Sequence, residues 1–466
     1  MTRNRRGQEP THYEPERLAR EADAMGAAYW QRQARFGWAI FQIAVWFGVV
    51  RLVGTSAVKV AFARWLRFEL IRFGAVFIKL GQMLSTRVDA FPPEVLDELA
   101  HLQDKVPSFP FEQVQAIIEE EFGEPAHMAF QHIDPTPLAA ASMGQVHAAV
   151  LPDGRECVIK VLRPGLEQGF ARDLTLMRRF AGWVSRQGWL LKLFVASPDT
   201  PWVTLVDRLG VSLYQQLDLW TEGLHGEKFA KNFEGWDRVS APAIFWTHSS
   251  TRVLTQERVY GFRFDDEQGI RAAGVDYGEV AALVMRAFTK QVFEDCFFHA
   301  DSHPGNLFVT SQGSVIYLDF GMVEYIDEVF QQQLVEMFIH VIQQDWERFL
   351  DDMVRAGVVP EEAPRELLMP IFVDVFSAQL GHSGRHYTLQ EVSDKFYAIV
   401  RNYPLRLPER FLFLTRNTAT LEGVVFRADP DFKFLPIALP FFAKLVLSRV
   451  DAENPWILQD MLRASE

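Results

Sequence analysis

The sequence predicts an α+β fold of two lobes that is rich in helix, and three observations lead to this prediction. The chain has 466 residues, of which 48% are hydrophobic, so it is long enough to bury two cores. Sequences typical of strands occur only in short segments in the middle of the chain, and turn sequences bound these segments. Most of the remaining chain repeats apolar residues at the three- and four-residue spacing of helices.

The elements follow in chain order. Residues 1–35 are polar and charged, which predicts a partly ordered arm. Helices are predicted over residues 36–130, and one of them ends at Phe91-Pro92-Pro93. A hairpin follows, with strands over 145–151 and 156–161 around a Pro-Asp-Gly turn. The later segments are expected to be helices over 166–187 and 206–234, a strand over Val253–Glu257, and helix over nearly everything after residue 321.

Composition limits the class of protein. The formal net charge is −13 and no block of basic residues occurs, so nucleic acid is not the expected partner. Cys157 and Cys296 are too few and too distant for a disulfide framework or a zinc site, which favours a reducing compartment. The first residues lack the apolar core of a signal peptide, so a cytoplasmic protein is expected.

Residues 36–50 (FGWAIFQIAVWFGVV) are uncharged and apolar on all sides. Fifteen residues fall short of the roughly 20 that a spanning helix needs, and Arg51 follows. Three interpretations stay open: a buried helix, a helix on a membrane surface, and a span. We expect reversible membrane association rather than a span, because the apolar run is short, Arg51 interrupts it, and aromatic rings such as those of Trp38 and Trp46 favour the interface. A second apolar stretch at 434–443 is broken by Pro436 and Pro440.

Three oxygen-bearing side chains stand at fixed spacings late in the chain. Asp301 is followed five residues on by Asn306, and Asp319 begins an Asp-Phe-Gly sequence. Residues 307–310 and 315–318 predict strands around a Ser-Gln-Gly turn, which would bring Asn306 and Asp319 side by side. This is the pattern of kinase-type phosphoryl transfer: an acidic residue faces the attacking oxygen, and an amide and a carboxylate hold Mg²⁺ on the nucleotide phosphates.

Lys160 lies in the second strand of the earlier hairpin, in Cys157-Val-Ile-Lys-Val161. A lysine there points toward the α- and β-phosphates of a nucleotide, whereas the simpler interpretation is an exposed strand lysine. The preceding loop is alanine-rich where a kinase carries glycines. Its small side chains allow a phosphate close to the backbone, but alanine lacks the positive-φ freedom of glycine.

These motifs resemble the UbiB/AarF family of atypical kinase-like proteins, which is associated with ubiquinone and isoprenoid-lipid metabolism. The resemblance extends from about residue 60 to 450. Its elements are the K-x-G-Q signature in Phe77–Arg87, Leu102–Pro107, the alanine-rich loop Pro137–His147, the segment His299–Asn306 with Asp319, and Thr420–Gly423 with Asp429 and Asp431.

The resemblance implies a bilobal atypical protein-kinase-like fold with an N-terminal helical extension packed over the active site. It divides the chain into a polar arm (1–35), the extension with the K-x-G-Q signature (36–130), a kinase-like N-lobe (131–260), a C-lobe (261–450) and a tail (451–466).

It also implies a role for each matching residue, with ATP or ADP and Mg²⁺ as cofactors. Lys160 would contact the phosphates and pair with Glu222, and Glu257 would meet adenine at the hinge. Asp301 would be the catalytic aspartate, and Asn306 and Asp319 would hold Mg²⁺. The loop over the phosphates would consist of Leu138, Ala139, Ala140, Ala141, Ser142, Met143, Gly144, Gln145 and Val146. The extension would act through Lys79, Gly81 and Gln82, together with Asp218 of an E-x-D motif.

The sequence departs from the family in several places. Gln216 replaces the glutamate of E-x-D, so it cannot neutralise Lys79. Ser302 replaces a proline, and the continuation after Glu222 is Gly223-Leu-His-Gly226. His299 and His303 flank Asp301, but no third nitrogen or sulfur donor at suitable spacing supports a metal site there.

Three functions remain in competition. The first is a Mg²⁺-dependent ATP-binding kinase or ATPase that supports isoprenoid quinone biosynthesis at a membrane, with a lipid-like small molecule or water as acceptor. Its partners would be a membrane lipid or quinone precursor and other quinone-biosynthesis enzymes. The second is a small-molecule phosphotransferase of the aminoglycoside or choline kinase type. The third is a nucleotide-gated lipid-binding scaffold of weak activity, which Gln216 favours.

Overall fold

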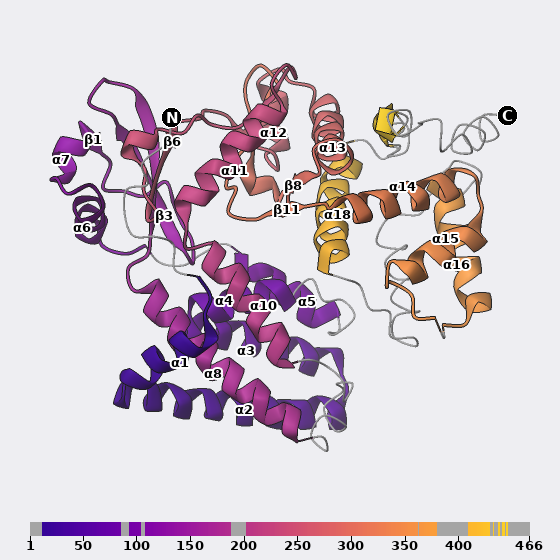
Figure 1. The fold of residues 1–466 in the computed structure, drawn as a ribbon, viewed down its shortest axis with the longest axis horizontal. Coiled ribbons are helices and arrows are strands. Elements are labelled where there is room, and N and C mark those ends of the chain that lie inside the picture. Colours follow the sequence, from indigo (N-terminus) through magenta and orange to yellow (C-terminus); the bar gives the residue numbers. More distant parts are fainter. Residues whose placement is uncertain are drawn as a thin grey trace. The chain divides into compact units, whose positions relative to one another are not determined.

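The chain forms two compact units in the computed structural model (Figure 1). The structure describes residues 12–84, 93–103, 108–187, 202–361, 363–379 and 409–428, together with 432, 437–438, 440–442 and 444–445. Unit 1 comprises Met1–Leu224 and Ala243–Arg258, and unit 2 comprises His225–Pro242 and Val259–Glu466. The helix end expected at Phe91-Pro92 and the tail at 451–466 lie outside the described residues.

Helices form the larger part of unit 1. They are α1 (Pro15–Ala24), α2 (Ala27–Val53), α3 (Ser56–Phe73), α4 (Ala75–Leu84), α5 (Pro93–Ala100), α8 (Leu166–Arg186) and α10 (Trp202–Gln215). The expected polar arm is helical over its described part from Pro15 onward. Proline is favoured at the first position of a helix, and Leu18 and Ala22 of α1 are buried where α1 packs on α8.

Helix α2 is longer and more exposed than the sequence predicts. It continues past Arg51 and ends at Gly54, whose φ of 65° caps it. Trp38 and Phe41 are 60% and 56% exposed, so the interpretation of this segment as a buried core helix is wrong. Within the described part of the chain, α2 is the one helix long and apolar enough to cross a membrane by length and composition, with a mean hydropathy of 1.7 over an 18-residue window.

The sheet of unit 1 is antiparallel, with strand order β1-β3-β4-β6 and β2 paired to β3. Its strands are β1 (His132–Ile133), β2 (Ala139–Ala140), β3 (Gly144–Val150), β4 (Glu156–Leu162) and β6 (Val253–Glu257). The predicted hairpin is confirmed as β3 and β4, and Gly154 takes a φ of 87° in its turn. Helices α6 (Phe111–Phe122) and α7 (Ala126–Ala129) share an apolar cluster with this sheet.

Helix α11 (Leu219–Asn232) contains the boundary between the units, which falls after Leu224. Unit 2 has a sheet of order β5-β10-β9-β7 and a separate pair, β8 (Phe297–His299) with β11 (Val323–Tyr325). The larger sheet contains β5 (Val239–Ser240), β7 (Phe262–Arg263), β9 (Leu307–Val309) and β10 (Val315–Tyr317). Strand β11 lies in the part of the chain for which the sequence predicts helix.

The core of unit 2 is built around α13 (Tyr277–Phe293), which is buried along most of its length. Asp276 caps its first turn by accepting hydrogen bonds from the N–H groups of Gly278 and Glu279. The remaining helices of the unit are α12 (Glu267–Ala272), α14 (Glu328–Ile342), α15 (Trp346–Arg355), α16 (Arg365–Gln379) and α18 (Glu409–Ala428).

Gly81 of α4 marks the tightest packing in the extension. A Cβ atom at this position would lie 2.2 Å from Leu102 Cδ1 and 2.9 Å from Leu70 Cδ1, both buried side chains. Gly81→Ala is therefore expected to lower the free energy of unfolding of unit 1 by about 1–2 kcal/mol, since overpacking outweighs the gain in helix propensity. Denaturant unfolding measures the change.

Gly169→Ala in α8 is the matched control, because a Cβ atom there meets nothing within 4 Å. It is expected to stabilise the protein by about 0.5–1 kcal/mol. If Gly81→Ala were as neutral or stabilising as the control, this close packing would not determine the identity of residue 81.

Candidate active site

Lys160 and Glu222 form the predicted ion pair in unit 1. The Nζ atom of Lys160 in β4 donates to both carboxylate oxygens of Glu222 in α11, at 2.7 and 2.9 Å. Their side chains are 19% and 7% exposed, so the carboxylate is removed from water and held by the lysine. In a kinase-type site this pair fixes the lysine that meets the nucleotide phosphates.

Glu257, the residue expected at the hinge, ends β6. Its N–H donates to Ala243 O at 2.8 Å, and its Oε2 accepts from Ala243 N at 3.3 Å. The boundary between the units follows directly after Arg258. The side chain of Glu257 therefore bonds to the backbone beside the end of β6. Adenine recognition by this segment stays a prediction.

The alanine-rich loop is a tight hairpin rather than an open loop. Ala139 and Ala140 form β2, and Ala141 N donates to Gly144 O at 2.8 Å to close the turn. Gly144 is required here, because a Cβ atom would lie 2.2 Å from Val161 O. Ser142 and Met143 are buried at 8% exposure. Two further predicted residues form the ends of the hairpin: Leu138, whose N–H donates to Val146 O, and Val146 itself.

Gln145 of this hairpin has a structural partner. Its side chain is 1% exposed and forms two hydrogen bonds with the backbone of Phe109, through Oε1 at 3.1 Å and Nε2 at 3.2 Å. It thereby joins the hairpin to the part of the extension just before α6. A contact of this side chain with phosphate would require both bonds to break.

The extension packs beside the hairpin within unit 1. Phe77 of α4 and Leu102 share an apolar cluster with Met143, and Gln82 Nε2 donates to Leu102 O at 3.3 Å. Asp218 is 5% exposed and its Oδ2 accepts from Thr221 Oγ1 at 2.5 Å. Gln216, in the place of the family glutamate, donates to Ser212 O at 3.4 Å. Lys79 is partly buried on the same helix as Gly81.

The catalytic loop of unit 2 is organised by His299. This residue is fully buried, and its Nδ1 accepts from the N–H of Asp301 at 3.2 Å while Nε2 lies 3.0 Å from Leu318 O. Because a carbonyl only accepts, the neutral imidazole with its proton on Nε2 fits both contacts. The backbone N–H of His299 also donates to Gln291 Oε1 at 2.9 Å. His299 therefore braces the loop.

Asn417 in α18 is a loop-supporting residue that sequence reasoning missed. It is 2% exposed, accepts from Ser302 N at 2.9 Å and donates through Nδ2 to His299 O. An amide side chain three residues before Thr420 was the available signal, but the sequence does not show that it is buried or which backbone groups it reaches 115 residues away.

Asn306 and Asp319 lie together, as the hairpin predicts. Strands β9 and β10 pair antiparallel, and Leu318 N donates to Asn306 O at 2.8 Å. The Asn306 amide nitrogen donates to Asp301 O at 3.0 Å, which makes its amide oxygen the atom that can ligate a cation. Asp319 takes a φ of 54° and accepts from Gly321 N at 3.2 Å. One amide and one carboxylate oxygen fit Mg²⁺.

Helix α11 also contacts the Asp-Phe-Gly segment through a residue that departs from the family. His225 Nδ1 lies 3.3 Å from Phe320 O, and a Cβ atom on Gly226 would lie 3.2 Å from the Phe320 ring. Gly226 therefore lets the helix approach the ring. Glu222 and His225 are three residues apart, so a single helix carries the partner of Lys160 and a contact to the residue after Asp319.

The chain is similar in sequence to proteins of one family. The family described as the ABC1 atypical kinase-like domain matches residues 101–353. A "Probable protein kinase UbiB" of Xylella fastidiosa is 33% identical over 414 residues, which cover 85% of this chain and 72% of that protein. "Protein ACTIVITY OF BC1 COMPLEX KINASE 7, chloroplastic" of Arabidopsis thaliana is 33% identical over 387 residues, 82% of this chain and 54% of that protein.

A solved structure shows the same fold. The complex of Rv3197 with erythromycin from Mycobacterium tuberculosis has a TM-score of 0.54 at 23% identity, covering 75% of this chain and 87% of that one. The α+β kinase-like fold and the resemblance to the UbiB/AarF family are confirmed. The chain spans 54% to 72% of the length of the two curated relatives named. With Lys160 and Glu222 paired and the Asp301 loop braced by His299, the chain belongs to the ABC1 atypical kinase-like family.

Proposed function

We propose that this protein is a Mg²⁺-dependent ATP-binding kinase or ATPase that supports isoprenoid quinone biosynthesis at a membrane. The observation that carries the proposal is the Lys160–Glu222 pair, which accompanies the spacing of Asp301, Asn306 and Asp319. A buried ion pair adds little net stability once the desolvation of its two charges is counted, so the pair points to a purpose other than folding. Contact with nucleotide phosphates provides that purpose.

Each residue has a task in this proposal. Lys160 would bind the nucleotide phosphates while Glu222 keeps it in place, and the amide oxygen of Asn306 and the carboxylate of Asp319 would hold Mg²⁺. The bound ion supplies positive charge that offsets the charge of the phosphates. Asp301 would accept the proton of the attacking hydroxyl or water, with its backbone fixed through His299.

The segment after Asp-Phe-Gly favours a small acceptor over a peptide. The chain passes from Gly321 into β11 and enters α14 at Glu328. No Ala-Pro-Glu sequence follows Asp319, and the peptide-docking segment of protein kinases lies between these two motifs. A lipid-like small molecule or water is therefore the proposed acceptor. The names of the two curated relatives, which mention UbiB and the bc1 complex, support a connection to quinone chemistry.

The exposed face of α2 supports membrane association. Trp38 and Phe41 stack at 5.3 Å between ring centroids and point away from the core. We expect the protein to float with phosphatidylcholine vesicles and to stay bound at high salt, because the contact rests on apolar burial. Replacing both rings by glutamine is expected to reduce the bound fraction about tenfold or more.

The matched control is the double variant Val329→Gln with Leu367→Gln, which removes two exposed apolar side chains of unit 2 and is expected to float normally. Full release by moderate salt would show an electrostatic contact and contradict the expectation, as would failure to float at any salt. Resistance to alkaline carbonate would show a span in place of reversible association.

Turnover of Mg²⁺-ATP, with and without vesicles and a phenolic quinone-precursor mimic, tests the function itself. The proposal expects turnover that rises with both additions. Turnover that depends on an aminoglycoside or choline would support a small-molecule phosphotransferase, and nucleotide binding without turnover would support a scaffold. Quinone profiling of a deletion strain complemented by wild type and by Asp319→Asn checks the biological role.

A further inference from the structure

The sheet of unit 1 has one closed face and one open face. Cys157 and Ile159 of β4 are fully buried and belong to the apolar cluster shared with α6 and α7. Successive side chains of a strand alternate between the two faces of a sheet, so Val158 and Lys160 point to the opposite face. Both are only half-buried, and Lys160 meets Glu222 of α11 there. The open face is therefore the one on which Lys160 would bind a nucleotide.

The register of β6 assigns Gln256 to the open face and Glu257 to the closed face. Residues that pair directly across an antiparallel ladder point to the same side of the sheet. Gln256 pairs with Val158 on the open face. Glu257 pairs with Cys157 on the closed face. The side chain that β6 presents to a nucleotide held by Lys160 is therefore that of Gln256, and the side chain of the expected hinge residue lies on the far face.

Gln256 lies beyond Lys160 in the direction that leads away from the alanine-rich hairpin. Lys160 pairs with Val146, and the hairpin turn at Ala141–Gly144 lies on one side of this pair. Val158 and Gln256 lie two residues to the other side, which is about 7 Å along the strands. With the phosphates at Lys160 and the hairpin over them, the base of a nucleotide would lie against Val158 and Gln256.

The side chain of Gln256 has an amide group available to a ligand. It is half-buried, and no residue in the described part of the chain forms a hydrogen bond with it. Its neighbours on the open face are apolar, with Val158 on β4 and Ile244 across the bridge on the other side. Sites for small ligands combine apolar walls with a few polar groups that fix the orientation of the ligand. Here the polar group is an amide, which offers a donor and an acceptor side by side.

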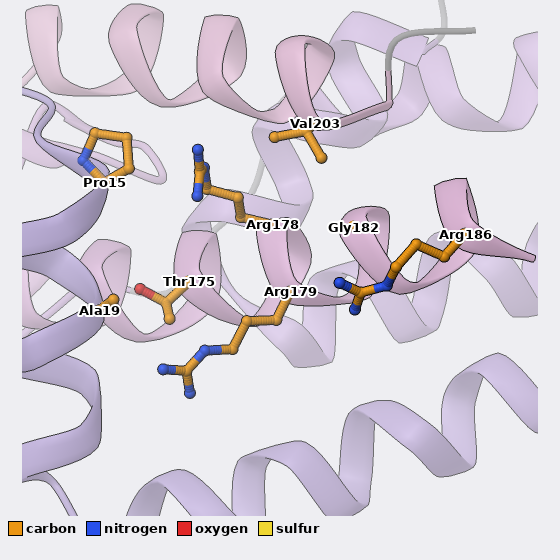
Figure 2. Close-up of a pocket in the computed structure, with 8 residues that line it drawn as sticks. All are labelled: Pro15, Ala19, Thr175, Arg178, Arg179, Gly182, Arg186 and Val203. Atoms are coloured by element: carbon orange, nitrogen blue, oxygen red, sulfur yellow. The ribbon is translucent and has the colours of Figure 1, made fainter. Parts of the chain in front are cut away.

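A pocket of about 310 Å³ in another part of unit 1 does not compete for the phosphates (Figure 2). It lies along α1, α8 and α10, and two of its arginines are already bound to carboxylates. Arg178 donates to Asp207 at 2.7 Å, and Arg179 donates to both oxygens of Asp23 at 2.8 Å. Figure 2 shows that these two guanidinium groups point away from each other, so the pair cannot clamp one phosphate.

We infer that Gln256 selects adenine as the base of the bound nucleotide, an inference that rests on the proposed function. A glutamine amide pairs with adenine through two hydrogen bonds, in which Oε1 accepts from the N6 amino group and Nε2 donates to N7. Guanine and hypoxanthine carry an oxygen at position 6, so this edge of both bases presents two acceptors. In the same geometry the amide oxygen would face one of these acceptors, which disfavours both bases.

The test is calorimetric titration of the full chain, in the presence of Mg²⁺, with three nucleoside diphosphates that avoid phosphoryl transfer. ADP offers both contacts, 7-deaza-ADP lacks N7, and IDP carries an oxygen in place of the N6 amino group. Wild type is expected to bind ADP about fivefold or more tightly than either analogue. Gln256→Met keeps the length of the side chain without its polar groups, so the preference over 7-deaza-ADP is expected to disappear and that over IDP to shrink.

Gln256→Glu is a second variant of nearly the same shape. Its carboxylate accepts from the N6 amino group but places an oxygen against N7, so this variant is expected to bind 7-deaza-ADP more tightly than ADP. Gln113→Met replaces an exposed glutamine of α6 and is the matched control, expected to keep the preference of wild type. Thermal unfolding without nucleotide checks that each variant is folded.

The outcomes separate this inference from the proposed function. ADP binding with the same preferences in wild type, Gln256→Met and Gln256→Glu would overturn the inference and leave the proposed function standing. Failure of folded wild type to bind any of the three nucleotides would overturn both. Loss of the preference in Gln256→Met together with its reversal in Gln256→Glu would assign the recognition of the base to this amide.

Discussion

Nucleotide affinity is expected to fall by about 100-fold or more in Lys160→Ala, and binding is expected to be abolished at ordinary assay concentrations. The lysine would supply charge-assisted hydrogen bonds to the phosphates, and each such bond is worth about 1.5–3 kcal/mol. Calorimetric titration with Mg²⁺ and a non-hydrolysable ATP analogue measures the loss. Unchanged affinity would contradict the assignment of the β3–β4 hairpin to the nucleotide.

Two further variants separate binding from folding. Lys59→Ala removes another lysine of unit 1, which lies 3.5 Å from Glu94, and is expected to bind normally. Lys160→Ala leaves Glu222 buried without its cation, so its Tm is expected to fall. Adding Glu222→Gln removes that charge and is expected to restore the Tm without restoring nucleotide binding.

Asp319→Asn is expected to lose Mg²⁺-dependent turnover by about 100-fold or more in kcat while it keeps the fold. The substitution removes only the charge that would face the metal. The fold is retained because asparagine, like aspartate, tolerates the left-handed conformation that Asp319 adopts at a φ of 54°. Steady-state ATP turnover at saturating Mg²⁺ is the measurement.

Asp327→Asn is the matched control for charge. Asp327 caps α14 by accepting from Phe330 N at 2.7 Å, and asparagine caps a helix as well as aspartate does. Its turnover is expected to equal that of wild type. Wild-type turnover in Asp319→Asn at saturating Mg²⁺ would rule out Asp319 as a metal ligand.

The parts of the fold that the sequence predicted depend on local signals. Pro152-Asp153-Gly154 and Ser311-Gln312-Gly313 mark turns, and the strands beside them pair in the register that those turns set. The spacing of Asp301, Asn306 and Asp319 predicted a common site for the same reason. The turn of the second hairpin brings its two ends together, and Asn306 and Asp319 lie at these ends.

The parts that the sequence did not reveal depend on contacts between distant segments. Strand β11 forms because Val323 and Tyr325 pair with His299 and Phe297, and the short run itself carries no turn signal. The apolar sequence of α2 was equally compatible with burial and exposure, and only its packing distinguishes them. The buried position of Gln145 follows from its bonds to Phe109, 36 residues away.

The position of Asn417 affects how much of the chain is needed to keep the catalytic loop in shape. The family match ends at residue 353, yet Asn417 holds the backbone on both sides of Asp301 from helix α18. Leu421, Val424 and Val425 of the same helix are buried in the core of unit 2. A chain shortened to the matched region would expose that core and leave the His299 carbonyl and the Ser302 amide without their partner. The smallest fragment that can preserve the loop therefore extends through α18, to about residue 428.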